Sequence, residues 1–237
     1  MKIIFFSDAH GNQYTVRRFF QQIAEDKADI VVFGGDIFGY YYGQKEILSL
    51  LRRSGCICLL GNHDQFFLNL IDGQKEIDYL VCRYGITYQE CMNTVNNDDI
   101  QFLRSLKSRY DLNIDGLHLS FVHGSIENPL NGRIYPDTKI NNFRPYEGID
   151  YVFMGHTHHK LVSFLANGTT LLNPGSIGQQ RDGKGCTYGI FDTEKREWKV
   201  KEVFYNCEDL VSEIGKHKET KQMYIRLVEV LYRGHTL

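Results

Sequence analysis

The sequence predicts a mixed α/β or α+β fold, with a parallel sheet and crossover helices followed by a second set of strands. Short apolar runs alternate with helical patterns early in the chain, and strand patterns dominate its second half. The 237 residues are enough for one sizeable core. Neither an internal repeat nor a long linker divides the sequence, so we expect a single domain over residues 1–237.

The first three expected strands alternate with two helices. Residues 3–6 form an apolar run, and apolar side chains over residues 16–24 follow the i, i+3, i+4, i+7, i+8 spacing of a helix face. Residues 30–33 form the next run, followed by a helical stripe over residues 47–51 and a third run at residues 56–60. Strands of this continuous apolar type are buried on both faces, which favours a parallel sheet.

The rest of the chain holds two further expected helices and then mainly strands. One helix is expected near residues 65–70, and Asn97, Asp98 and Asp99 open another, because acidic groups suit a helix N-terminus. The expected strands cover residues 117–122, 151–154, 161–165, 169–172, 187–191 and 198–204. With few helices between them, they predict a second, largely antiparallel sheet, and the residues from Glu208 onward are expected to be helical.

Composition excludes several classes of protein. Lys and Arg number 27 against 29 Asp and Glu, for a net charge of -2, so we expect no bulk nucleic-acid-binding surface. The longest apolar run, residues 56–60, is far short of the roughly 20 residues that span a bilayer, and the N-terminal run is too short for a secretory signal. We therefore expect no membrane association, reduced cysteines and a cytoplasmic location.

Five of the expected strands end in a polar cluster. These clusters lie at residues 6–10, 33–36, 60–64, 122–124 and 154–158. Ligands of open α/β sheets gather at the carboxyl ends of strands, so the five clusters can converge on one place. A single Asp after a strand is usually a helix cap and a single His usually a satisfied polar group, but five clusters in a row are hard to explain as caps.

The residue types in these clusters suit divalent transition metals. Imidazole nitrogen and carboxylate oxygen are ordinary ligands of such ions, and the absence of cysteine excludes a thiolate zinc site. Asp8 and His10 lie two apart in a segment expected to be extended, which places both on one side, and His156 and His158 share that spacing. Six or seven ligands exceed the need of one ion, so we expect two metals, each Mn, Fe, Ni, Co or Zn.

Taken together, the clusters resemble the full motif set of the calcineurin-like metallophosphoesterase superfamily. The motifs cover about two thirds of the chain and comprise Asp8 with His10, Asp36 after two glycines, Gly61-Asn62-His63-Asp64, His123-Gly124 and Gly155-His156-Thr157-His158. Residues 35–40 and 173–183 further resemble the small stand-alone bacterial branch of that superfamily. The resemblance implies a four-layer α-β-β-α sandwich, in which two mixed sheets are flanked by helices.

The resemblance also implies a ligand set. It assigns one metal to Asp8, His10 and His158, the second to Asn62, His123 and His156, and a bridging role to Asp36. Two dications offset by the carboxylates of Asp8 and Asp36 leave the site positive, which suits a phosphate ester as the partner. In the family, the counterpart of His63 donates a proton to the leaving oxygen, and Asp64 is expected to orient it. The alternatives are a solvated His63 and an Asp64 that caps the following helix.

Other signals are weaker. Tyr40, with its neighbours Tyr41 and Tyr42, is a candidate for stacking on a nucleobase, although aromatic loop clusters more often only pack. Arg181 can bind a phosphate or lie in solvent beside a tight turn. Residues 125–150 are a candidate substrate-facing loop. Arg226, Arg233 and His235 are interpreted as a solvated helix end.

The leading hypothesis is a dinuclear-metal phosphoesterase, and more narrowly a phosphodiesterase. A metal-bridging hydroxide attacks phosphorus in line and His63 protonates the departing oxygen. The alternatives on the same site are a phosphomonoesterase and a dinucleoside-polyphosphate hydrolase. A non-catalytic scaffold is a third, because the retromer scaffold subunit resembles this superfamily but lacks the histidine at the position of His63. The sequence leaves the substrate, a nucleotide or another small phosphate ester, and the oligomeric state open.

Overall fold

A computed structural model describes residues 1–140, 143–183 and 185–233. Its strands are β1 (Lys2–Phe6), β2 (Ile30–Phe33), β3 (Ile57–Cys58), β4 (Arg109–Ile114), β5 (Leu117–Val122), β6 (Tyr151–Phe153), β7 (Lys160–Phe164), β8 (Thr170–Pro174), β9 (Cys186–Asp192) and β10 (Glu197–Val203). Its helices are α1 (Gln13–Ile23), α2 (Gln44–Ser54), α3 (Asn62–Ile71), α4 (Ile77–Tyr84), α5 (Thr87–Thr94), α6 (Asn97–Ser105), α7 (Cys207–Ile214) and α8 (Lys221–Arg233).

The first sheet has the strand order β10-β9-β1-β2-β3. Strands β1, β2 and β3 run parallel, as the alternating strand and helix patterns predict. Strands β9 and β10 were expected in the second sheet, but they extend the first one, and β9 pairs antiparallel with β1. The apolar pattern of a strand depends on its burial and not on the sheet that it joins. The sequence therefore could not predict that β9 and β10 belong to the first sheet.

The second sheet has the order β4-β5-β6-β8-β7 and is mixed. The prediction of a largely antiparallel sheet is wrong, because β5, β6 and β8 are parallel neighbours and only the edge strands β4 and β7 pair antiparallel. The edge strand β4 was not predicted. Its sequence, RYDLNI, is half polar and none of its residues is fully buried, so it lacks the apolar run that marks the other strands.

The core between the two sheets and the core under the helices meet at β1. Ile3 and Phe5 face the second sheet, in a cluster with Phe121 and Phe153, whereas Ile4 and Phe6 face the helices. All four β1 side chains are fully buried, as the continuous apolar run predicts. The rings of Phe121 and Phe153 stack at 4.7 Å and tie β5 to β6.

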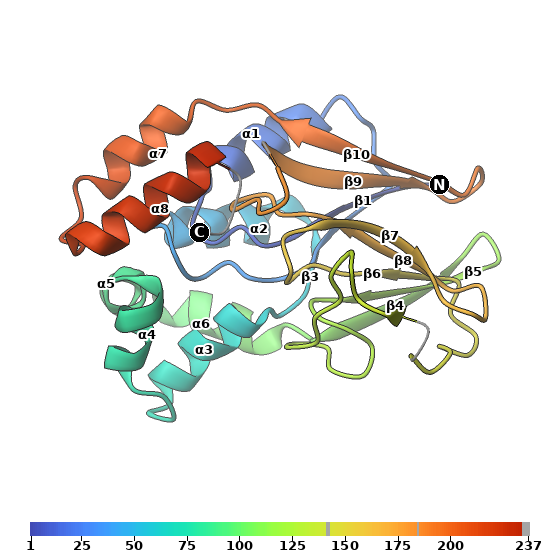
Figure 1. The fold of residues 1–237 in the computed structure, drawn as a ribbon, viewed down its shortest axis with the longest axis horizontal. Coiled ribbons are helices and arrows are strands. Elements are labelled where there is room, and N and C mark those ends of the chain that lie inside the picture. Colours follow the sequence, from blue (N-terminus) through green and yellow to red (C-terminus); the bar gives the residue numbers. More distant parts are fainter. Residues whose placement is uncertain (141–142, 184, 234–237) are drawn as a thin grey trace.

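Two mixed five-stranded sheets flanked by helices confirm the predicted α+β sandwich (Figure 1). Helices α1 and α2 pack against the first sheet through the large apolar cluster that also receives α3 and α6. The outer face of the second sheet has an irregular cover, because side chains such as Ile134 and Tyr146, from the segment between β5 and β6, pack on Val152 there. This segment includes residues 141–142, which lie outside the described residues.

The helices α4, α5, α7 and α8 lie at one end of the molecule, away from the strands (Figure 1). Helices α4 and α5 have only eight residues each, about two turns, which is too short to give a clear helical pattern in the sequence. Helices α7 and α8 pack on Tyr41 through Leu210 and Leu227 and so form a wall next to the loop after β2. In the described chain, no helix has the length and apolar character needed to cross a membrane.

Candidate active site

The five polar clusters converge, as predicted, at the carboxyl edges of parallel strands. β1, β2 and β3 end at one edge of the first sheet, and β5 and β6 end at the neighbouring edge of the second. No side chain of the nine expected site residues in these clusters exceeds 7% exposure. These residues are Asp8, His10, Asp36, Asn62, His63, Asp64, His123, His156 and His158. The structure thus brings all nine into one buried region.

The backbone of these loops is left-handed at five non-glycine residues. The φ angles are 62° at Asp8, 46° at His10, 66° at Asp36, 65° at His156 and 61° at His158. The expectation that these segments are extended is therefore wrong. In each pair of residues two apart, the left-handed backbone, and not an extended one, brings the side chains together. Residues held in this region cost free energy and persist where the surrounding structure fixes them, which is typical of functional sites.

Two glycines allow the loops to approach one another. A Cβ atom at Gly61 would overlap the carboxylate and backbone nitrogen of Asp36, and one at Gly155 would overlap the side chains of Ser7 and Asp8. Only glycine fits at these close approaches. The glycines of the sequence motifs therefore hold the carboxylates and the opposing loops at contact distance.

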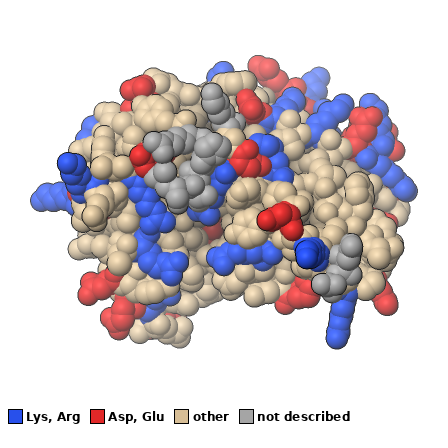
Figure 2. Space-filling view, viewed as in Figure 1, with Lys and Arg blue, Asp and Glu red and all other residues tan. Residues whose placement is uncertain are grey.

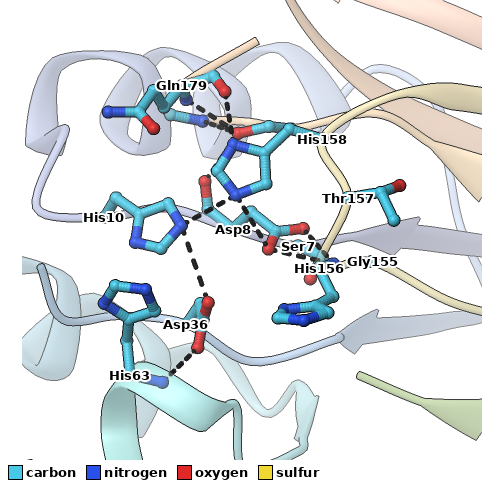
Figure 3. Close-up of polar contacts among 12 residues, drawn as sticks. Ser7, Asp8, His10, Asp36, His63, Gly155, His156, Thr157, His158 and Gln179 are labelled. Atoms are coloured by element: carbon cyan, nitrogen blue, oxygen red, sulfur yellow. Dashed lines mark hydrogen bonds and ion pairs between the residues drawn. The ribbon is translucent and has the colours of Figure 1, made fainter. Parts of the chain in front are cut away.

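The first candidate ligand group consists of Asp8, His10 and His158. One ligand atom from each lies within 4.8 Å of the others, and all three side chains are buried. The Nε2 atom of His158 lies 3.4 Å from Asp8 Oδ1 and 3.0 Å from His10 Nε2. Figure 3 shows the two imidazole rings and the carboxylate directed toward one another. The group can hold one divalent cation.

The second candidate group consists of Asp36, His123 and His156, again within 4.8 Å of one another. Asn62 joins it, because its Oδ1 atom lies 3.0 Å from His123 Nε2. Asn62 is the first residue of α3, which begins three residues earlier than the predicted helix. The first turn of α3 thus delivers its side chains directly to the strand edge.

The carboxylate of Asp36 stands between the two groups. Its Oδ2 atom lies 3.6 Å from His10 Nε2 and 3.2 Å from His123 Nε2. Its other oxygen, Oδ1, accepts a 2.8 Å hydrogen bond from the backbone N–H of His63. One oxygen is therefore fixed by the protein and the other faces both groups, an arrangement that suits a bridging ligand.

The hydrogen bonds of the imidazole rings test whether the site fits metal ions. His10, His123 and His158 each bond through Nδ1 to a backbone carbonyl, at 2.6 to 2.9 Å. In the neutral form of each ring, this bond places the proton on Nδ1 and leaves the Nε2 lone pair facing other lone pairs of the site. The buried Nε2 atom of His156 has no hydrogen-bond partner at all. Cations at these positions would satisfy every one of these nitrogens.

The pKa values of these imidazoles agree with that fit. Burial lowers the pKa of His10 to about 4 and holds that of His158 well below its usual range, so both rings are neutral, the form that binds metals. Burial also lowers the pKa of His123, but the Asp36 carboxylate outweighs it and raises the value to about 9. The site thus favours a positive charge between Asp36 and His123.

His63 lies beside the two groups with its ring held by Tyr88. The Tyr88 hydroxyl donates to the backbone carbonyl of His63 at 3.3 Å, and its oxygen lies 2.8 Å from His63 Nδ1. With that hydroxyl donating to the carbonyl, we assign the proton to Nδ1, which then donates to Tyr88, and Nε2 lies on the opposite side of the ring. Burial, with the nearby imidazoles of His10 and His158, holds the pKa of His63 well below its usual range.

Asp64 does not orient the His63 ring but caps α3, which is the alternative that the sequence offered. Its carboxylate accepts hydrogen bonds from the backbone N–H groups of Gly61, Asp36, Ile37 and Phe38, at 2.7 to 3.2 Å. It therefore fixes the loop of Asp36 and the start of α3, and the orientation of the His63 ring falls to Tyr88. Burial and the Asp36 carboxylate raise the pKa of Asp64 to about 6.

A cleft of about 390 Å³ opens from the ligand groups toward the surface. Arg181 and Tyr40 both line it, and the Arg181 guanidinium donates to the Tyr40 hydroxyl at 2.9 Å and to Gln179 Oε1 at 2.8 Å. The solvent interpretation of Arg181 is therefore wrong. The stacking hypothesis does not extend to the neighbouring tyrosines, because Tyr41 is fully buried and Tyr42 stacks on His217.

Several cleft residues were missed by the sequence analysis. Tyr84, Arg83, Asn131, Arg133, Tyr135 and Arg226 line the cleft together with the expected residues. Asn131, Arg133 and Tyr135 belong to the candidate substrate-facing loop of residues 125–150. This part of the loop lines the cleft, as expected. Arg226 was interpreted as part of a solvated helix end, but α8 returns to the cleft and presents it there. Arg233 has no described side chain, and His235 lies outside the described residues.

Fold and site together define a class: a two-sheet sandwich whose strand-end loops gather carboxylate, amide and imidazole groups for two cations. The chain belongs to the calcineurin-like phosphoesterase superfamily, whose domain model matches residues 1–196. Members of this family are phosphate-ester hydrolases, and the predicted family is confirmed. The uncharacterized protein MJ0912 of Methanocaldococcus jannaschii is 28% identical over 90% of this chain and 91% of its own length.

Solved structures agree with the family assignment. A metallophosphoesterase from Sphaerobacter thermophilus is 26% identical over 97% of this chain and 99% of its own, with a TM-score of 0.75. The hypothetical protein PH1004 from Pyrococcus horikoshii OT3 is 20% identical, covers 100% of this chain and 99% of its own, and has a TM-score of 0.79. Their lengths match this chain, so α7 and α8 lie within the region of similarity.

Proposed function

We propose that the protein is a dinuclear-metal phosphodiesterase that acts on a small phosphate ester. The observation that carries this proposal is the position of Asp36 Oδ2 between His10 and His123, since one oxygen faces both ligand groups. Asp8, His10 and His158 would hold one ion and Asn62, His123 and His156 the other, with Asp36 shared. Two bound divalent ions supply an activated water molecule and stabilise the charge that develops on the phosphoryl oxygens.

In this proposal His63 supplies the proton that the departing oxygen needs. Its ring lines the cleft. The Tyr88 hydroxyl accepts a hydrogen bond from Nδ1–H, so Nε2 is the nitrogen that faces the substrate. A bound phosphate ester places negative charge beside the ring and raises the pKa of His63. Substrate binding thus favours the imidazolium form, which donates a proton from Nε2.

The shape of the cleft supports a diester over a monoester. Phe66, Tyr84 and Tyr135 line the cleft together with His63, and the ring centroids of Phe66 and Tyr84 lie 5.4 Å and 4.6 Å from that of His63. Such rings pack against an organic substituent and leave room for two ester groups on phosphorus. The presence of His63 in the cleft is also the observation that distinguishes this chain from a scaffold that lacks it.

A substrate panel tests the proposed function. The protein, loaded with Mn²⁺, Fe²⁺, Ni²⁺, Co²⁺ or Zn²⁺ in turn, is assayed on bis(4-nitrophenyl) phosphate, on 4-nitrophenyl phosphate and on a dinucleoside polyphosphate. We expect the highest kcat/KM on a diester and loss of turnover with a chelator. Highest activity on the monoester would assign a phosphomonoesterase, and no turnover with any metal would favour the scaffold.

A further inference from the structure

Four arginines line the cleft beyond the ligand groups. They are Arg83 from α4, Arg133 from the segment after β5, Arg181 from the loop after β8 and Arg226 from α8. Asp36 is the one carboxylate among the described lining residues, and it faces the ligand groups. This concentration of positive charge contrasts with the net charge of -2 of the whole chain. The cleft is therefore built for more negative charge than a single phosphodiester carries.

In the described part of the chain, these four arginines have no carboxylate partners. Within the described residues, none of the four forms an ion pair with a carboxylate, although Arg17, Arg52, Arg104 and Arg109 elsewhere do. An unpaired guanidinium in a concave site offers a planar set of donors that matches a phosphate group. Figure 2 shows basic side chains gathered on this face, in the region between α8 and α4 in Figure 1.

Arg83 and Arg226 are held together at the outer part of the cleft. The Arg226 side chain donates to the backbone carbonyl of Arg83 at 3.3 Å, which joins α8 to the end of α4. The Arg83 guanidinium donates to the Tyr79 hydroxyl at 3.0 Å. Both arginine side chains are exposed, and each keeps further N–H groups for a ligand.

A single aromatic ring separates this arginine pair from His63. The Tyr84 ring centroid lies 4.6 Å from the His63 ring centroid, and the Arg83 guanidinium carbon lies 5.8 Å from the Tyr84 centroid. A nucleoside with phosphates on two of its sugar oxygens, or a polyphosphate chain, spans a separation of this size. A phosphate at the arginine pair can thus belong to the same molecule as the phosphate beside His63.

We infer that Arg83 and Arg226 form a second anion subsite, which binds a phosphate group of the substrate other than the one hydrolysed. This inference rests on the proposed function and narrows it to one substrate class: nucleotides that carry at least two phosphate groups. Tyr84 and Phe66, which line the cleft between the two positions, provide apolar surface for the part of the nucleotide that joins them. Arg226 lies on α8, outside the residues 1–196 that the family model matches.

Binding of two matched ligands tests the inference. Isothermal titration calorimetry on metal-loaded protein compares thymidine 3′,5′-bisphosphate with thymidine 5′-monophosphate, which differ by one phosphate group. We expect the dissociation constant of the bisphosphate to be at least about tenfold lower than that of the monophosphate, because one charge-assisted hydrogen bond contributes about that much. Arg226→Gln and Arg83→Gln should each reduce that ratio toward one without weakening the monophosphate. Arg18→Gln, on the exposed face of α1, is the matched control and should leave both affinities unchanged.

The outcomes separate this inference from the proposed function. Equal affinity for the two ligands, or a preference that survives both arginine substitutions, would overturn the subsite. Equal affinity combined with arginine-dependent binding of inorganic phosphate would also overturn it and assign the pair to a free anion. Hydrolysis of bis(4-nitrophenyl) phosphate, which has no second phosphate, is measured in parallel. Its absence would count against the proposed function and leave the binding comparison valid.

Discussion

The Nε2 atoms of His10 and His158 lie 3.0 Å apart, although each ring already bonds through Nδ1 to a backbone carbonyl. Both nitrogens therefore present lone pairs to the same small space, next to the carboxylates of Asp8 and Asp36. Such an arrangement is repulsive unless a cation lies among these atoms. The position of the two rings thus links the folding of the loops to metal binding.

Asp36→Ala removes the oxygen that faces both ligand groups, so metal content should fall at both positions. His158→Ala touches only the first group and should cost about one metal ion per chain. Metal analysis of protein purified without chelator gives both values. Asp98→Ala, at a carboxylate that is 80% exposed, serves as the control. Two metals and near-normal turnover in Asp36→Ala would show that the carboxylate is not shared.

His63→Ala should leave both metals and the fold in place and reduce turnover. General acid catalysis contributes about 10²- to 10⁴-fold, and most where the leaving oxygen is a poor one. We therefore expect a large loss on an alkyl or ribose diester and a small loss on an aryl diester, whose phenolate leaves without a proton. Equal losses on both esters would assign His63 to charge stabilisation, and unchanged rates would remove it from the reaction.

Tyr88→Phe should act through His63 as the loss of a positioning residue. The substitution removes the acceptor of the His63 Nδ1 proton and keeps the ring volume. We expect kcat on an alkyl diester to fall about tenfold with KM and metal content unchanged. The ionisation of His63, above which the rate falls, should move to lower pH. Tyr84→Phe, which changes a neighbouring ring, should leave that ionisation in place. A pH profile identical to that of the wild type would contradict this role.

The pairing of Asp99 with Lys45 and Arg52 ties α6 to α2 and predicts a pH-dependent stability. Burial alone raises the pKa of Asp99, but the hydrogen bonds from Lys45 and from the N–H of Asn96 outweigh it and lower the pKa below 3.8. A lowered pKa in the folded state means that this stability is present above pH 3.8 and is lost as the pH falls through the folded value.

Asp99→Asn should therefore reduce the free energy of unfolding by about 1–3 kcal/mol at pH 7. Urea denaturation at several pH values should show this difference shrinking below pH 3.8, where the wild type also protonates. Asp98→Asn is the control, since that side chain is exposed and lies 4.0 Å from Arg52. A difference that stays constant across the acidic range would reject the ionic contribution.

Most site residues could be predicted because they follow the ends of apolar strands. Asp8, Asp36 and His123 follow apolar strands directly, and the carboxyl ends of parallel strands meet at one edge, so a local pattern fixes a tertiary position. The left-handed backbone at residues such as His10 was not predictable, because an L-residue adopts it only when the surrounding loops impose it. The sequence therefore located the residues and not the geometry that joins them.

Residues that reach the site from the helical end could not be predicted. Tyr88 and Arg83 lie on helices of only eight residues, and Arg226 lies on α8, far from every motif in the sequence. Their roles depend on how α4, α5 and α8 pack around the loop after β2, a long-range contact that leaves no local signal. Asp64 lies within a sequence motif, but its role was equally hidden. Three of its four backbone partners belong to a different loop, the one after β2.

Titration of metal-free protein with Mn²⁺ tests directly whether the site binds two ions and needs both for hydrolysis. Bound metal and hydrolysis of bis(4-nitrophenyl) phosphate are measured on the same samples. We expect binding to saturate at two ions per chain and hydrolysis to rise with the second ion, and we expect Asp36→Ala to show neither. Saturation at one ion with full hydrolysis, or two bound ions without any hydrolysis, would contradict this expectation.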